Sequence, residues 1–233
     1  MGNPAPKRII RKLDLERFLS QIEVHPFPQA GLEQYTVSEA IAATLLYIAA
    51  YTNDDVIGRT VLDLGCGTGR LALAASFLGA KCVVGVDIDK MAIKTAAENS
   101  EKVGAKNDVQ WVVGDVTAIT GNFDTVIMNP PFGVQKRAAD RKFLEKALEV
   151  GNAVYSLHNH PHTDKQLIKR LKANPESLLR VEPSPFIEKF VESHRGVVEA
   201  VYALLMTIPR MFDFHTKMKH DFVVDLYIIK KNG

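Results

Sequence analysis

The chain has 233 residues, 46% of them apolar, so it can bury one substantial core and a single domain is expected. The formal net charge of +2 excludes a broadly basic surface, so any contact with nucleic acid must come from local clusters. The longest apolar run near the start, residues 41–51, is too short to span a bilayer, and no signal peptide is visible. Two cysteines, Cys66 and Cys82, are expected in buried positions without disulfide or zinc spacing, which suits a cytoplasmic protein.

Two helices are expected before the first strand. Residues 13–22 have helical periodicity, and a capping box formed by Thr36 and Glu39 is expected to open a second helix. The apolar residues of this second helix share one face, which would pack on a sheet. They are Ile41, Leu45 and Ile48.

A glycine-rich turn follows the first expected strand, residues 61–64, and leads into a helix over residues 71–78. Glycines at alternate positions let the backbone approach a ligand closely, and the helix offers its amino end. A second strand, residues 82–87, ends in Asp87, and in such folds this acid binds ribose hydroxyls. Arg70 stands where the dinucleotide fingerprint requires a small residue, which argues against NAD. The turn therefore indicates another nucleotide-like ligand, with a purely structural loop as the alternative.

The third expected strand, residues 109–113, leads into Asp115. This carboxylate could accept a hydrogen bond from an adenine amino group. It could equally cap the turn or helix that follows, which is a common role of Asp after a strand.

The fourth expected strand, residues 123–128, ends in the tetrapeptide Asn129-Pro130-Pro131-Phe132. The Asn129 carboxamide and the Pro130 carbonyl can both accept hydrogen bonds from one amino group, and the two prolines add no backbone donor. Phe132 can stack on a flat ring, a contact worth about 1–3 kcal/mol per base in nucleic-acid binders. The tetrapeptide is typical of a site for a flat, conjugated amine. A proline turn with a capping Asn is the alternative.

The remaining elements continue the alternation of strands and helices. Helices are expected over residues 89–103, 140–150 and 186–194, and strands over residues 153–155, 198–208 and 222–229. Strands that alternate with helices require a parallel, doubly wound sheet.

The order of these motifs resembles that of Rossmann-like methyltransferases that use S-adenosylmethionine. Flanking sequences narrow the match: Leu32-Glu33-Gln34-Tyr35, Ser156-Leu157-His158, the Phe214-His215 pair and the last strand. Together they resemble the methyltransferase-like protein five family, in an archaeal form, over most of residues 10–230. Members of this family make N6-methyladenosine in small-subunit ribosomal RNA.

This resemblance implies a class I, α/β fold with a seven-stranded, mostly parallel sheet and an antiparallel C-terminal hairpin. Residues 1–35 would be a helical extension packed on a methyltransferase domain over residues 36–233, with an insertion at residues 159–185. The implied cofactor is S-adenosylmethionine, without a metal. Its expected contacts are Gln34, Tyr35, Asp63, Gly65, Gly67, Thr68, Gly69, Asp87, Ile88, Asp115, Val116 and Asn129. The expected catalytic residues are Asn129, Pro130, Pro131 and Phe132. Val37 departs from relatives, which carry Thr there.

RNA contacts are expected from basic residues around the site. The candidates are Lys136, Arg137, Arg141, Lys142, Lys217, Lys219 and His220. Solvated surface positions are the alternative for each cluster. The strand over residues 109–113 would be an exposed sheet edge, where members of the family pair with a small zinc-ribbon activator, unless Trp111 is buried against a helix. His158, His160 and His162 alternate, but no acid or cysteine completes a metal site.

The expected mechanism is direct methyl transfer to an exocyclic amine without a general base, with hydrogen bonds localising the amine lone pair. Positioning of donor and acceptor could lower the barrier by about 7–11 kcal/mol. The nearer alternatives are amino-group methyltransferases that act on protein glutamine, guanine N2 or DNA adenine. The farther alternative is a non-catalytic module that keeps the pocket.

Overall fold

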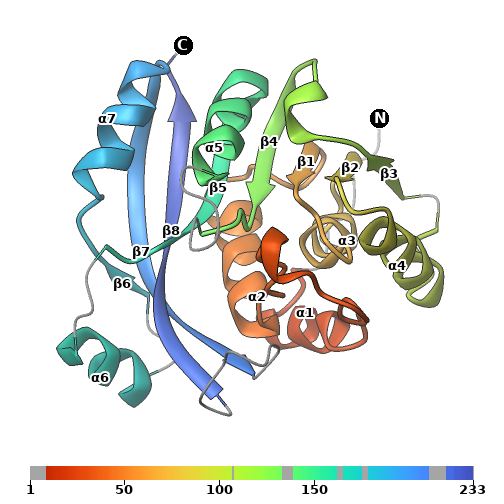
Figure 1. Ribbon diagram of the computed structural model, residues 1–233, viewed down its shortest axis with the longest axis horizontal. Helices are drawn as coiled ribbons and strands as arrows, with labels where there is room; N and C mark the ends of the chain where they lie inside the picture. Colours follow the sequence, from red (N-terminus) through yellow and green to blue (C-terminus); the bar gives the residue numbers. More distant parts are fainter. Residues whose placement is uncertain are drawn as a thin grey trace, which may run out of the picture.

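The computed structural model describes residues 9–106, 108–132, 139–161, 165–174, 178–209 and 219–232. At its centre lies one sheet of eight strands in the order β3-β2-β1-β4-β5-β8-β7-β6 (Figure 1). The first five strands pair in parallel, whereas β8 is antiparallel to β5 and to β7. The parallel strands are β1 Thr60–Leu64, β2 Cys82–Asp87, β3 Val109–Val113, β4 Phe123–Met128 and β5 Gly151–Asn159.

The C-terminal part of the sheet is a long hairpin of β7, Gly196–Pro209, and β8, Lys219–Lys231. The prediction of seven strands was wrong by one, because the short strand β6, Leu179–Arg180, pairs with the outer edge of β7. A two-residue strand is too short to leave an alternating pattern in a sequence, and only its pairing with β7 at Ala203 and Tyr202 defines it. The parallel core with its antiparallel hairpin is confirmed.

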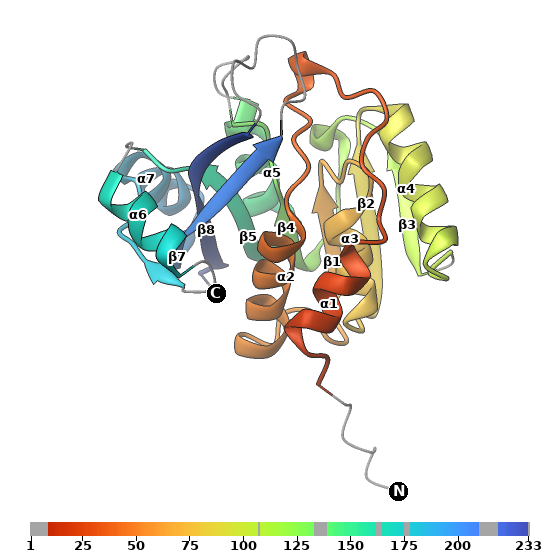
Figure 2. The ribbon, with the colours of Figure 1, turned by 90° about the horizontal axis from the view of Figure 1, so that it is seen from below.

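Helices cover both faces of the sheet, as Figure 2 shows. One face packs against α1, α2 and α3, and the other packs against α5 and α7. Neighbouring residues of one strand divide between the two cores, as the two-residue period of a strand requires: Ile127 faces the first core and Val126 the second. The helices are α1 Lys12–Leu19, α2 Glu39–Tyr47, α3 Arg70–Phe77, α4 Lys90–Lys102, α5 Ala139–Val150, α6 Lys165–Ala173 and α7 Pro185–Ser193.

The predicted capping box was wrong in its first residue. Ser38, not Thr36, precedes the first turn of α2, and its side chain accepts a hydrogen bond from Ile41 N at 3.4 Å. Glu39 instead pairs with Arg70, with 2.8 Å between Oε1 and Nη1. After Tyr47, α2 widens into a π-helical turn over Ile48–Thr52.

The N-terminal residues share the core of the rest of the chain. Leu15 and Leu19 of α1 are fully buried in the first core, and Phe18 stacks on Phe77 of α3 with 4.2 Å between ring centroids. Residues 20–38, which we name the strap, connect α1 to α2 and arch alongside β1 and β2 (Figure 2). The strap therefore reaches the edge of the sheet where the glycine-rich turn lies.

The segment expected to be an insertion packs on the hairpin. Leu167 and Leu171 of α6 form a small cluster with Ala203 and Val223, and the lysines of this helix are exposed, as its amphipathic pattern predicts. Among the described helices, none combines the length and the apolar character needed to cross a membrane. Of the two free cysteines Cys66 is buried as predicted, whereas Cys82 is only half-buried.

Candidate active site

A cavity opens at the carboxyl ends of β1, β2 and β4, where open α/β sheets place their ligands. The strap forms one of its walls, and residues of the glycine-rich turn and of α5 complete it. Most of the predicted cofactor contacts line it: Gln34, Tyr35, Asp63, Gly65, Gly67, Thr68, Asp87, Ile88, Asp115, Val116 and Asn129. Of the other predicted site residues, Pro131 lines the cavity too, whereas Gly69, Pro130 and Phe132 do not contribute to the wall.

The glycine-rich turn is held in a conformation that a larger side chain would disturb. Gly65 has a φ of 73°, and a Cβ atom there would lie 2.7 Å from the Phe143 ring. Gly69, with a φ of 85°, precedes the first turn of α3, and a Cβ there would lie 2.5 Å from the ring of Trp111. Gly69 therefore serves packing behind the turn, whereas Gly65 borders the cavity itself.

Asp87 connects the glycine-rich turn to the end of β2. Its Oδ2 accepts a hydrogen bond from Gly67 N at 2.8 Å, and its Oδ1 accepts one from Asp89 N at 2.9 Å. Burial raises the pKa of this carboxyl, and the two backbone hydrogen bonds oppose that shift. Because each carboxylate oxygen has a second lone pair, Asp87 can still accept hydrogen bonds from two ribose hydroxyls.

Asp63 is almost completely buried at the cavity wall. Its Oδ2 accepts a hydrogen bond from Ala72 N at 2.9 Å, but its buried Oδ1 has no partner among the described residues. Loss of solvation raises the pKa of this carboxyl to about 8. An acceptor of this kind fits a ligand that brings hydrogen-bond donors or positive charge, and S-adenosylmethionine carries both.

Asp115 has the capping role, one of the two that the sequence left open, and its contact with an adenine amino group stays a prediction. Its Oδ1 accepts hydrogen bonds from Thr117 N at 2.9 Å and Thr117 Oγ1 at 2.7 Å, so it caps the short helical turn Val116–Ala118. It also lines the cavity, together with the buried Val116.

The Asn129 carboxamide is oriented by the strap. Its Nδ2 donates a hydrogen bond to the Tyr35 carbonyl oxygen at 3.0 Å, and its buried Oδ1 has no partner in the described parts of the chain. The hydrogen bond to Tyr35 thus orients the carboxamide and leaves its Oδ1 atom able to accept a hydrogen bond from a ligand. Phe132 contacts Phe222 edge to face, with 5.8 Å between ring centroids.

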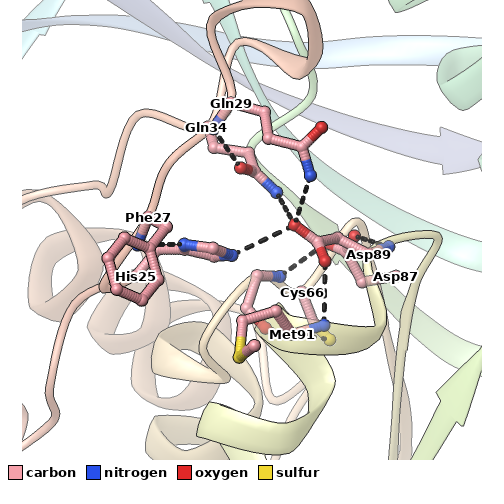
Figure 3. Close-up of polar contacts among 9 residues, drawn as sticks. His25, Phe27, Gln29, Gln34, Cys66, Asp87, Asp89 and Met91 are labelled. Carbon is pink, nitrogen blue, oxygen red and sulfur yellow. Dashed lines mark hydrogen bonds and ion pairs between the residues drawn. The ribbon is translucent and has the colours of Figure 1, made fainter. Parts of the chain in front are cut away.

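Sequence reasoning missed a cluster around Asp89, which it placed only at the start of a helix. His25, Gln29 and Gln34 of the strap all direct side-chain nitrogens at this carboxylate (Figure 3). No local signal could have revealed the cluster, because its contacts join residues 55 to 64 positions apart. Phe143 of α5, which also lines the cavity, was likewise missed.

The predicted RNA contacts are only partly described. Lys136, Arg137 and Lys217 lie outside the described residues, as do the side chains of Lys219 and His220. Arg141 is exposed on the first turn of α5, and its guanidinium carbon lies 4.5 Å from the centre of the Phe186 ring. Its neighbour Lys142 lines the cavity.

The histidines after β5 have partners in the sheet. His158 Nε2 lies 2.8 Å from Ser156 Oγ, and burial lowers the His158 pKa to about 4. His160 Nδ1 lies 2.9 Å from both carboxylate oxygens of Asp225. His162 lies outside the described ranges, within which no cluster of three or more metal-binding side chains occurs.

Comparisons with known proteins agree with this geometry. The family model of the Methyltransferase small domain matches residues 38–170. The chain is 34% identical to the rRNA N(6)-adenosine-methyltransferase METTL5 of Danio rerio, over 91% of this chain and 95% of that protein. A crystal structure of a candidate RNA methyltransferase from Pyrococcus horikoshii superimposes with a TM-score of 0.79 at 36% identity, covering 96% and 99% of the two chains.

More distant structures share the fold alone. A magnesium protoporphyrin IX methyltransferase from Synechocystis, crystallised with S-adenosylhomocysteine, has a TM-score of 0.57 at 16% identity and covers 82% of this chain and 83% of its own. The fold and the cavity define a class I methyltransferase whose cofactor is S-adenosylmethionine. Within this class, the chain belongs to the methyltransferase-like protein five family.

Proposed function

We propose that this enzyme methylates the N6 amino group of an adenosine in RNA, and that its substrate is small-subunit ribosomal RNA. The observation that carries the proposal is the Asn129 carboxamide at the end of β4. Its nitrogen is occupied by the Tyr35 carbonyl, and its Oδ1 is left as a buried acceptor at the cavity. The curated relatives from Danio rerio and Drosophila melanogaster are named as rRNA N6-adenosine methyltransferases, which supports the same substrate.

S-adenosylmethionine supplies an electrophilic methyl group on a sulfonium. The exocyclic amine of adenine is a poor nucleophile, because its lone pair is delocalised into the ring. Asn129 Oδ1 would accept one N–H group and so stabilise positive charge that develops on the nitrogen. Pro130 does not line the cavity, so its carbonyl as the second acceptor stays a prediction. The target base must leave its stack at a cost of a few kcal/mol, which is least in a loop or a single strand.

The role of Asn129 can be tested by replacing it with alanine. Asn129→Ala should abolish methyl transfer to ribosomal RNA, because the acceptor for the amino group is lost. Cofactor affinity measured by calorimetry should stay within about twofold, since a loss of less than half a kcal/mol corresponds to that factor. Turnover equal to that of the unchanged enzyme would refute the role. Asn129→Asp keeps an acceptor but loses the donor to Tyr35 O, so it should also be strongly impaired.

The substrate can be identified by mass spectrometry of nucleosides and amino acids after ribosomal subunits, protein and DNA are each incubated with isotopically labelled cofactor. Label in N6-methyladenosine is the expected result. Label in N2-methylguanosine, in methylglutamine of a protein, or in DNA adenine would replace this substrate by one of the related amino-group substrates. Absence of label from every substrate, with ribosomal subunits and an activator supplied, would favour a binding module.

We further propose that the edge strand β3 pairs with a small zinc-ribbon activator protein. Strand β3 ends the sheet, and its Val112 and Val113 are 38% and 50% exposed. Trp111 is half-buried and packs toward Gly69 and Gly85, so the large exposed apolar residues of the edge are the two valines. Exposed edges invite pairing with another chain. A fully active monomer at low concentration would contradict the heterodimer.

We also propose that the protein is cytoplasmic. Its two free thiols are consistent with a reducing compartment.

A further inference from the structure

Three side chains of the strap contact the same carboxylate oxygen of Asp89. Its Oδ2 lies 3.1 Å from His25 Nε2 and accepts hydrogen bonds from Gln29 Nε2 at 3.2 Å and Gln34 Nε2 at 2.8 Å (Figure 3). Its Oδ1 accepts the hydrogen bond of Met91 N at 2.8 Å and so caps α4. Only 9% of the residue is exposed, yet Asp89 does not line the cavity. Any effect it has on the cofactor must therefore be indirect, through the strap or through Asp87, to which its backbone N–H donates.

The ends of the strap are held by other residues. Asn99 of α4 accepts from Glu23 N at 2.9 Å and donates to Glu23 O and Thr68 O, both at 3.0 Å. At the other end, Arg70 donates to Val37 O at 2.9 Å. Asp89, at the start of α4, thus holds the middle of the strap, residues 25–34. Loss of Asp89 should release this middle part while both ends and the two cores stay in place.

The middle of the strap connects the cofactor wall to the catalytic motif. Gln34 contacts Asp89 with its side-chain nitrogen, and with Oε1 it accepts the Gln29 backbone N–H at 2.7 Å. Tyr35, the next residue, accepts the hydrogen bond of Asn129 Nδ2. The backbone N–H of Asp89 also donates to Asp87, the acid expected to bind the ribose. A continuous set of contacts therefore runs from Asp89 through Gln34 and Tyr35 to Asn129.

We propose that Asp89 is a positioning residue, which fixes the strap over the cofactor cavity and through Tyr35 orients the Asn129 carboxamide. A carboxylate suits this task because one oxygen can accept several donors, and hydrogen bonds to an ionised acceptor are about twice as strong as neutral ones. The part of the inference that concerns Asn129 rests on the catalytic role proposed above, whereas the part that concerns the cofactor wall does not.

The test uses Asp89→Asn in the full chain, with calorimetry for S-adenosylmethionine, steady-state transfer to RNA and hydrogen exchange of the strap. The expected result is a rise of about tenfold in the cofactor dissociation constant, equivalent to about 1.4 kcal/mol. The KM for cofactor should rise, and kcat should fall about threefold or more because Asn129 is less well oriented. Exchange should speed up within residues 25–34 but not in α2. Glu98→Gln, which removes the same charge from an exposed position of α4, should change none of these quantities.

An unchanged dissociation constant and unchanged strap exchange in Asp89→Asn would overturn the inference, whatever Asn129 does. A tenfold higher dissociation constant for the cofactor with an unchanged kcat would overturn only the connection to Asn129. If Asp89→Asn does not fold, Gln29→Ala provides the test. Gln29 contacts Asp89 but does not line the cavity, so we expect its loss to weaken cofactor binding about threefold. No weakening in that variant would again overturn the inference. Failure of the proposed function would instead appear in the labelling experiment, as label in a product other than N6-methyladenosine or as no label at all.

Discussion

At the scale of single residues, two buried oxygen atoms of the cavity wall have no hydrogen-bond partner in the described parts of the chain. Asp63 Oδ1 and Asn129 Oδ1 are both buried, and both belong to residues of the cavity wall. Leaving a buried acceptor without a partner costs about 1–3 kcal/mol, so such atoms are rare outside functional sites. Both residues line the cavity next to the glycine-rich turn. We therefore expect a ligand that brings hydrogen-bond donors to stabilise the folded enzyme when it binds there.

Asp63 should make the stability of the ligand-free enzyme depend on pH. Burial raises its pKa to about 8 in the folded chain, whereas an unfolded chain has a value of about 3.9. Between about pH 4 and pH 8 the folded state keeps a proton that the unfolded state has released, so this group's contribution to stability falls as pH rises. The loss can reach about 1.4 kcal/mol per pH unit.

Asp63→Asn removes this titration. The free energy of unfolding of the unchanged enzyme should fall relative to that of the variant as pH rises. Between about pH 5 and pH 7 the difference should change by at least about 1.4 kcal/mol. Urea unfolding across this interval measures the difference. A constant difference would show that Asp63 does not titrate there.

Residues near strand ends were predictable from the sequence, because parallel strands bring their carboxyl ends to one edge of the sheet. Gly65, Asp87 and Asn129 were found in this way. His25 and Asp89 were not, because their pairing depends on how the strap crosses the sheet, which no local pattern encodes. Phe132 was predicted to stack on the substrate base because of its place in the motif; its ring contacts Phe222 and does not line the cavity. Its stacking role stays a prediction.

At the scale of elements, Arg70 joins the strap, α2 and α3. Its guanidinium donates to Val37 O at 2.9 Å, to Glu39 Oε1 at 2.8 Å and to Ile22 O at 3.2 Å. The sequence indicated only that a large residue here does not fit a dinucleotide fold. The structure supplies the reason for its presence, since the buried side chain joins both ends of the strap to the start of α2.

Arg70→Met should therefore lower the free energy of unfolding by about 1–3 kcal/mol, because it leaves buried carbonyl oxygens without a donor. The half-exposed pair with Glu39 should contribute little to this loss, since solvent screens such pairs. Chemical denaturation measures the change. Arg17→Met, at an exposed position of α1, is the matched control and should alter stability by less than about 0.5 kcal/mol. Equal effects of the two variants would contradict the bridging role.

Element types were largely predictable, and boundaries less so. The alternation of apolar strands and amphipathic helices predicted β3 and β4 with their observed bounds. The start of α2 was misplaced because both Thr36 and Ser38 are good caps, and the engagement of Glu39 by Arg70 is a tertiary contact. The division of the chain into an extension, a core and an insertion stays a prediction.

At the scale of the whole molecule, a small net charge has to be reconciled with an RNA substrate. We expect Arg141 to supply such local charge, because it is exposed beside Lys142, whose side chain borders the cavity. Its position over the Phe186 ring also places a cation next to an exposed aromatic surface. A strand of RNA that delivers a base into the cavity would pass this surface.

Arg141→Ala should weaken RNA binding uniformly across sequences and reduce the dependence of log affinity on log salt by about one unit, as expected for one lost phosphate contact. Fluorescence anisotropy with labelled RNA at several salt concentrations measures both. Lys94→Ala, on the exposed face of α4, provides a comparison of equal charge and should leave the slope unchanged. The same slope in all three proteins would exclude Arg141 from the RNA interface.

Trp111 gives the molecule a built-in optical probe. It is the one tryptophan of the chain, and its indole packs behind the glycine-rich turn against Gly69 and Gly85 while its backbone forms the outer strand β3. Emission from a single indole in this position should report on the filling of the cavity in front of the turn and on the docking of the partner proposed for the edge strand. Both can therefore be followed in real time without any label.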